Sequence, residues 1–127
     1  MIEHAWLREI SEDTEYTPSY LTEELPVSQA GEAGRHFIKV FDRLDDSAVR
    51  KAFRLVEQTL KDGDEEERSA AATGFLEAVL NAWDTGFDLR SIWPYVGPES
   101  RKYCLWWNEF TGVPTPEWMR AADVGSG

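Results

Sequence analysis

The most complete helical pattern of apolar and polar positions runs from residue 64 to residue 87. Its apolar positions recur every three or four residues and form one broad stripe: Ala72, Phe75, Leu76, Val79, Leu80 and Trp83. Asp64 can cap the start of this helix, and Gly86 can end it. The pattern predicts a core helix over residues 65–84, and Gly74 within it indicates a close crossing with another helix.

Two helices are predicted before this one. The first is expected over residues 32–44, after a loop in the segment VSQAGEAG, and its stripe is Phe37, Ile38, Phe41 and Leu44. The second is expected over residues 47–61, capped by Asp46 or Ser47 and ended by Gly63, and its stripe is Val49, Ala52, Phe53, Val56 and Leu60. Because short connections join the three helices, they should alternate in direction as an up-down-up layer.

The N-terminal part and the tail carry weaker patterns. Residues 1–17 are acidic with a short apolar stripe, which fits either one or two turns of helix or a loosely docked arm. Thr17 and Pro18 are typical of a helix start, so a short helix is predicted that ends before Pro26. Residues 122–127 are expected to fray.

Downstream of Gly86, Asp88 can cap a short helix, LRSIWPYV, and Pro98 can start another over residues 98–110. A further turn of helix is expected around Trp118 and Met119. No segment alternates as a strand would. The side of helix 98–110 that we expect to be buried is Tyr103, Trp106, Trp107 and Phe110. The sequence thus predicts an all-α fold, a single-domain antiparallel bundle of about five to six helices over residues 1–127, with HEAT-like helix pairs as a variant.

Composition fits this expectation and narrows the compartment. Six Trp, six Phe and four Tyr in 127 residues can fill a substantial core. Cys104 is the only cysteine, which excludes an intrachain disulfide and is typical of a reducing compartment. The N-terminus lacks the pattern of a signal peptide, and no window approaches ~18 consecutive apolar residues. We therefore expect a cytoplasmic protein that is not anchored in a membrane.

The charge limits the partners that the chain can attract. Against 24 acidic residues there are 13 basic ones, a net charge of −11 that repels nucleic acid and anionic membranes. We therefore expect no direct binding to either. The same field would speed the approach of a basic protein, although acidic surfaces also serve solubility alone.

Reaction chemistry is not indicated by any residue pattern. His4 and His36, the only histidines, fall in the N-terminal arm and beside a core stripe, which does not predict a metal site. Cys104 is more typical of a buried apolar residue than of a nucleophile. Glu77 and Asp84 border the stripe of helix 65–84. We expect Glu77 to lie at a solvated helix edge or to form a buried structural hydrogen bond to the following loop. Phosphate loops, dinucleotide fingerprints, GxSxG and HExxH are absent, so we predict no cofactor, metal or catalytic residue, and no enzyme.

Two surface features could instead bind a protein. One is acidic charge, in the turn before helix 65–84 and at Glu9, Glu12, Asp13, Glu15, Glu23 and Glu24. The other is the exposed part of an aromatic set, Trp93, Tyr95, Trp106, Trp107 and Trp118, most of which we expect in the core. The residues predicted to contact a partner are Asp62, Asp64, Glu65, Glu66, Glu67, Glu77, Asp84, Asp88, Trp93 and Tyr95.

The segments ATGFLEAVLNAW and IWPYVGPESRKYCLWW resemble a pattern of small bacterial helical proteins, a GFLE-type helix followed by an LGPxS-type turn into an aromatic helix. The matching positions are Gly74, Phe75, Leu76 and Glu77, then Val96, Gly97, Pro98, Glu99 and Ser100, and the resemblance covers roughly residues 45–110. Such proteins are similar in size and acidity to the immunity proteins of bacterial polymorphic toxin and contact-dependent inhibition systems. The resemblance implies a helical fold and supplies no catalytic residue.

Three functions follow as hypotheses. The leading one is an immunity protein that binds and neutralises a cognate toxin domain through an acidic surface; many such toxins act on nucleic acid and carry basic clefts. The second is a general helical interaction or adaptor module with no toxin partner. The third is a small enzyme that uses Glu77, Asp84 or His36, which would require a deep pocket lined by at least two of them.

Overall fold

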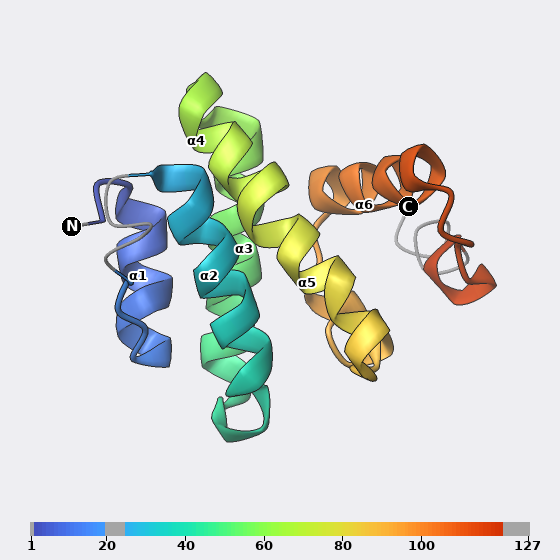
Figure 1. Ribbon diagram of the computed structural model, residues 1–127, viewed down its shortest axis with the longest axis horizontal. Helices are drawn as coiled ribbons and strands as arrows, with labels where there is room; N and C mark the ends of the chain where they lie inside the picture. Colours follow the sequence, from blue (N-terminus) through green and yellow to red (C-terminus); the bar gives the residue numbers. More distant parts are fainter. Residues whose placement is uncertain (1, 20–24, 121–127) are drawn as a thin grey trace.

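Every regular element of the described residues, 2–19 and 25–120 of this computed structural model, is helical (Figure 1). The α-helices are α1 (Ala5–Thr14), α2 (Pro26–Lys39), α3 (Asp46–Asp62), α4 (Glu65–Ser69), α5 (Glu77–Asn81) and α6 (Pro98–Thr111). Short 3-10 turns lie at Phe41–Arg43, Ala82–Thr85, Leu89–Ser91 and Trp93–Tyr95. The predicted all-α bundle is confirmed.

The long helix predicted over residues 65–84 is continuous from α4 through α5 to the turn Ala82–Thr85. Asp64 and Glu67 form a capping box at its start: Asp64 Oδ1 accepts from the Glu67 amide at 2.8 Å, and Glu67 Oε1 accepts from the Asp64 amide at 3.1 Å. Gly86 ends it with φ of 95°. Between α4 and α5, residues Ala70–Leu76 are π-helical, so their hydrogen bonds enclose one more residue than those of an α-helix.

The long helix crosses α2 at very short range. A Cβ atom on Gly74 would lie 2.6 Å from the Ala30 Cβ and 2.6 Å from the Val27 carbonyl oxygen, closer than real contacts allow. A Cβ on Gly34 would lie 2.9 Å from the Phe75 carbonyl oxygen. The crossing predicted at Gly74 is therefore confirmed.

The start of α2 differs from the prediction. Pro26 was expected to end a helix, but it is the first residue of α2, where its missing N–H is not needed. The segment VSQAGEAG is therefore helix rather than loop, because its small residues are buried against the π-helical segment. Residues 17–19 are not helical, and most of the short helix predicted after Thr17 lies outside the described residues, as does the tail 122–127.

The interpretation of the N-terminal residues as a loose arm is wrong. Trp6, Leu7 and Ile10 of α1 are buried in the common core. α1 packs along α3, where Lys51 Nζ lies 3.5 Å from Glu9 Oε1 and 3.2 Å from Asp13 Oδ2. α1 is thus part of the bundle, docked by apolar burial and by charges at its rim.

Aromatic rings hold the helices together at the centre. The rings of Phe37, Phe53 and Phe75, from α2, α3 and the long helix, meet edge-on with centroids 5.6 to 6.3 Å apart. Trp6 of α1 packs edge-on against Phe75 at 6.3 Å.

In Figure 1, α2 and the long helix run in one direction and α3 in the other, so the predicted up-down-up order is confirmed. Trp83, predicted in the core stripe, is 48% exposed instead.

After Gly86, two short turns connect the long helix to α6. The segment predicted as one short helix forms two 3-10 turns, and Asp88 caps the first by accepting from the Arg90 amide at 3.0 Å. α6 then begins at Pro98, as predicted, and packs against α3 and the long helix. A helical turn at residues 117–120 follows, with Met119 buried.

Candidate protein-binding surfaces

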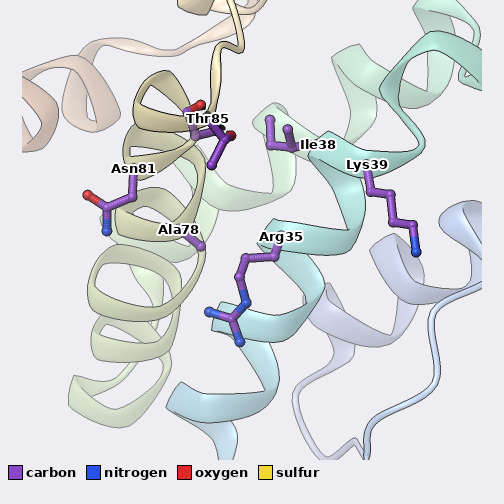
Figure 2. Close-up of a pocket in the computed structure, with 7 residues that line it drawn as sticks. Arg35, Ile38, Lys39, Ala78, Asn81 and Thr85 are labelled. Atoms are coloured by element: carbon purple, nitrogen blue, oxygen red, sulfur yellow. Dashed lines mark hydrogen bonds between the residues drawn. The ribbon is translucent and has the colours of Figure 1, made fainter.

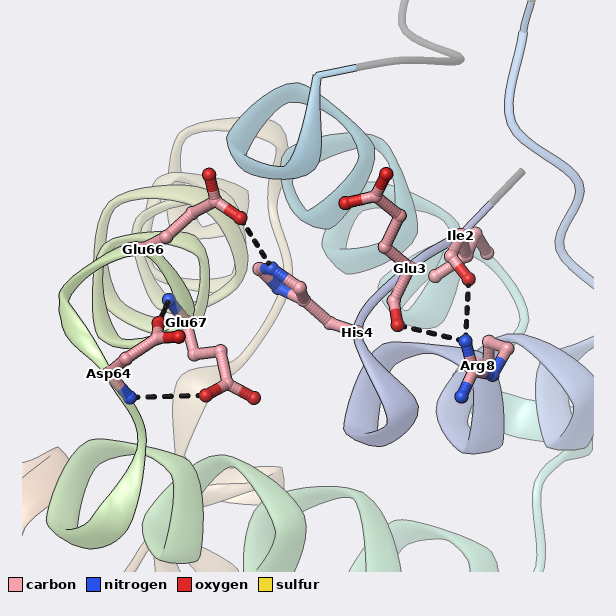
Figure 3. A network of polar contacts seen from close by, with 7 residues as sticks. All are labelled: Ile2, Glu3, His4, Arg8, Asp64, Glu66 and Glu67. Carbon is pink, nitrogen blue, oxygen red and sulfur yellow. Dashed lines mark hydrogen bonds and ion pairs between the residues drawn. The ribbon is translucent and has the colours of Figure 1, made fainter.

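The predicted acidic turn lies at the junction of α3 and α4, and we call Asp62, Asp64, Glu65, Glu66 and Glu67 the acidic end. Four of these side chains are exposed, and Glu67 is half-buried in its capping box. His4, from the segment before α1, reaches this end: its Nε2 lies 3.0 Å from Glu66 Oε1 (Figure 3). His4 is 8% exposed, so it is a buried contact rather than part of a mobile arm.

Glu77 and Asp84 take different places on the long helix. Glu77, half-buried, accepts a hydrogen bond from the Tyr103 hydroxyl and so ties the long helix to α6. Burial, together with this hydrogen bond, raises the pKa of Tyr103 far above its usual range. Asp84 lies exposed in the turn after α5. The prediction of a structural hydrogen bond therefore holds for Glu77, although its partner is a helix rather than the following loop.

Trp93 was predicted as a partner contact, but it is 3% exposed and cannot serve as an anchor in this structure. The Arg101 guanidinium lies over its ring at 5.0 Å, and Trp118 packs edge-on against it at 6.0 Å. Its aromatic surface is used within the fold because residues from α6 and the C-terminal turn cover it.

Tyr95 and Asp88 are both at the surface but already bound. The Tyr95 hydroxyl donates to Asp46 Oδ1 at 2.5 Å, and Arg50 lies 5.2 Å above the Tyr95 ring. The Tyr95 hydrogen bond lowers the pKa of Asp46. Asp88 forms an ion pair with Arg90 at 3.1 Å. Each of these predicted contacts would have to exchange an internal partner for an external one.

The side of α6 predicted to be buried faces solvent. Trp106 is 51% exposed and Phe110 69% exposed, while Tyr103 and Trp107 are half-buried; we call these four residues the aromatic face. The opposite side of α6 is buried instead: Ser100, Arg101, Cys104 and Asn108. The sequence named Trp106 and Trp107 in an aromatic set whose exposed part could bind a protein, but it predicted this side of the helix to be buried because large aromatic side chains are usually core residues.

The four rings of the aromatic face are contiguous. Trp106 and Phe110 stack with centroids 5.1 Å apart and planes 14° apart, Tyr103 lies 5.5 Å from Trp106, and Trp107 lies 6.1 Å from Phe110. Glu109 is exposed next to Trp106, at the edge of this face, and forms no ion pair among the described residues. The face therefore offers a continuous ring surface with a carboxylate beside it.

A groove follows the crossing of α2 with the long helix. One pocket of about 370 Å³ is lined by residues of both helices, among them Ile38, Ala78 and Ala82, and Arg35 of α2 extends toward α5 (Figure 2). A neighbouring pocket of about 320 Å³ shares Arg35, Ala78 and Asn81 and also includes Glu77.

The residues of the enzyme hypothesis are not brought together in this groove. Of the three, only Glu77 lines it; Asp84 lies in the turn after α5, and His36 Nε2 is bonded to the Thr14 carbonyl oxygen at 2.8 Å. The polar side chains that do line the groove include Arg35 and Asn81, which both pockets share, and Glu77 in the second pocket.

Cys104 and possible metal ligands add no further site. Burial raises the pKa of the Cys104 thiol to about 12, so the thiol stays protonated and unreactive near neutral pH. In the described part of the chain, no three His, Cys, Asp or Glu side chains are grouped so that they could hold a metal ion. None of the helices in these same ranges is long and apolar enough to cross a membrane.

Comparison with known proteins identifies a family but no characterised relative. Neither the curated proteins nor the solved structures contain a match to this chain. A family described as Domain of unknown function (DUF7674) matches residues 4–112, a range that begins before α1 and ends just after α6. The matched range therefore includes the acidic end, the groove and the aromatic face. The chain belongs to the DUF7674 family.

Proposed function

We propose that this protein is an immunity protein, which acts in the cytoplasm by binding a cognate toxin domain and blocking it. The observation that carries the proposal is the inverted α6: the helix buries polar residues and exposes Trp106 and Phe110. Exposed, contiguous aromatic surface is typical of a region that another protein covers. Blocking by occupation of a surface requires no reaction chemistry from the immunity protein itself.

The charge of the chain supports a basic partner. The net charge is −11, and the acidic end concentrates exposed carboxylates at the junction of α3 and α4. Such a field would accelerate the encounter with a toxin that carries a basic, nucleic-acid-binding cleft. We therefore assign the acidic end to steering and the aromatic face to the bound contact.

The first experiment is a protection assay. The toxin domain encoded next to this protein would be expressed with and without it, and survival and complex formation would be scored. We expect rescue together with a stable complex. Death in both cases, with this protein folded and abundant, would reject the immunity proposal and favour an adaptor module with another partner.

Charge reversal then tests the steering role. Asp62→Lys with Glu65→Lys should lower the association rate with the toxin and make it less dependent on salt, because both carboxylates are exposed at the acidic end. Asp42→Lys with Glu117→Lys, also at exposed positions and not among the predicted contacts, makes the same change in charge away from this end and is the matched control. Equal association rates for the two double variants would assign steering to the net charge alone.

A further inference from the structure

We propose that the aromatic face of α6 receives an arginine-bearing segment of the partner protein, with a guanidinium group stacked on the Trp106–Phe110 pair beside Glu109. This inference rests on the proposed function, because it names the chemistry of the toxin segment that would be bound. It assigns the central contact to α6, whose Trp106 belonged to the candidate aromatic set but not to the residues predicted to contact a partner.

The first argument is the orientation of α6. Ser100, Arg101 and Asn108 are at most 7% exposed, whereas Trp106 and Phe110 are more than half exposed. Rotating the helix would bury the rings, yet the fold prevents this: Glu57 of α3 holds the first turn of α6, and Arg101 donates to the Trp93 carbonyl oxygen at 3.0 Å. The rings are thus held outward by polar contacts of other α6 residues, of which the Arg101 hydrogen bond is buried.

The second argument is how the chain treats its other aromatic residues. Arg101 covers the ring of Trp93, and Arg50 covers the ring of Tyr95. Among the described residues, no lysine or arginine covers Trp106 or Phe110 in this way. A cation over an aromatic ring is a favourable contact, and the fold already contains two such contacts. The rings of the aromatic face are open to a third one, with a cation of the partner protein.

The third argument is charge. Glu109 is exposed without an ion pair in the described ranges, and Glu77 is joined to the edge of the face through Tyr103. The lysine on this side of α6, Lys102, is bound to Glu99 at 3.1 Å. A cationic segment therefore fits. A second copy of this chain does not, because it carries the same net charge of −11 and the same exposed carboxylate on this face.

Arginine suits this surface better than lysine does. Its guanidinium is planar, so it can stack on the rings and still donate to a carboxylate at its edge. Trp106 is the preferred ring for such a contact, and Glu109 lies one helical turn from it. The expected geometry is a guanidinium parallel to the stacked rings with its N–H groups directed at Glu109.

The test uses a synthetic helical peptide with three arginines on one side, and a second peptide in which uncharged citrulline replaces each arginine. Binding would be followed through the Trp106 indole N–H resonance, which Trp106→Phe assigns. We expect the arginine peptide to shift this resonance. Affinity should fall about two- to fivefold for the citrulline peptide and for Trp106→Ala, and should also fall for Glu109→Gln.

Trp83→Ala, which removes an exposed tryptophan outside the face, is the matched control and should bind normally. Circular dichroism and thermal unfolding would confirm that all variants are folded. Shifts confined to the acidic end, or equal binding by Trp106→Ala, would overturn this inference. Concentration-dependent dimerisation of the protein that is abolished by Trp106→Ala would also overturn this inference. If the Trp106→Ala variant protects against the toxin as well as the unmodified protein does, the aromatic face is not the contact with the toxin. The immunity proposal would still stand.

Discussion

A carboxylate from α3 secures the first turn of α6. Glu57 Oε2 accepts from the Glu99 amide at 2.9 Å, and Glu57 Oε1 accepts from the amide and the hydroxyl of Ser100 at 3.0 and 2.8 Å. The N-cap residue, Gly97, has no side chain for this purpose, and a Cβ there would lie 2.5 Å from the Glu57 carboxyl carbon. Glu57 thus replaces a local cap with a tertiary one.

Replacing Glu57 should therefore loosen α6. For Glu57→Ala we expect the free energy of unfolding to fall by about 1–2 kcal/mol, because amide groups at a helix start lose their acceptor. Urea denaturation measures this as a lower midpoint with an unchanged slope. Gln58→Ala, at an exposed neighbouring position, is the control. An unaltered midpoint for Glu57→Ala would show that water replaces the carboxylate without loss.

The buried thiol of Cys104 gives a chemical readout of the fold. Burial raises its pKa from 9.0 to about 12, so at pH 8 the folded chain should react with a disulfide reagent far more slowly than the urea-unfolded chain. The same shift lowers stability as pH rises from about 9 toward 12, because only the unfolded chain releases the proton there. Rapid labelling of the folded protein at pH 8 would contradict the buried position.

At the scale of elements, the crossing of α2 with the long helix depends on Gly74. Gly74→Ala should lower the free energy of unfolding by about 1–3 kcal/mol, although alanine favours an isolated helix by about 1 kcal/mol, because the helices must move apart. Thermal or urea unfolding measures the loss. Ser69→Ala, exposed directly before the π-helical segment, should change stability by no more than about 0.5 kcal/mol. Stabilisation by Gly74→Ala would mean that the crossing can open without penalty.

The sequence predicts best those helices whose ends and stripes are local. α3 and the long helix have capping carboxylates and a terminal glycine within the segment, and their bounds were predicted to within a few residues. Asp45 rather than Asp46 or Ser47 caps α3. The start of α2 was not predicted, because proline and small residues are typical of a loop when the helix that packs against them is not known. These residues are buried by contacts with the long helix, and such contacts cannot be predicted from the periodicity of apolar positions within the segment.

The candidate site was predicted only in part, for a related reason. Exposed charges at the acidic end follow from the sequence because carboxylates avoid burial. The sequence also named an aromatic set with Trp106 and Trp107 in it, but it could not tell which of these rings are exposed, because large rings are normally core residues. The exposure of the aromatic face depends on Glu57 and Arg101, which fix the rotation of α6 through contacts far apart in the sequence. The predicted burial of these rings is therefore wrong, because the fold keeps an apolar surface exposed although apolar side chains are usually buried.

On the scale of the whole molecule, α1 closes the bundle. Leu7 is fully buried, so Leu7→Ala should lower the free energy of unfolding by about 2–5 kcal/mol in one cooperative transition. Glu12→Ala, exposed on the same helix, should have little effect. Urea unfolding followed by tryptophan fluorescence separates the two. A negligible effect of Leu7→Ala would restore the earlier interpretation of a loosely docked arm.

The π-helical segment Ala70–Leu76 has a consequence for how members of this family can diverge. A residue more or fewer there would rotate everything downstream by about 100°, turning Glu77 away from Tyr103 and α5 away from α2. Residues 70–73 of this segment can change among small residues, whereas Gly74 and Phe75 are held by their contacts and the length of the segment cannot change. Aligned relatives that share this architecture should show substitutions between residues 70 and 73 and no insertion or deletion between residues 70 and 76.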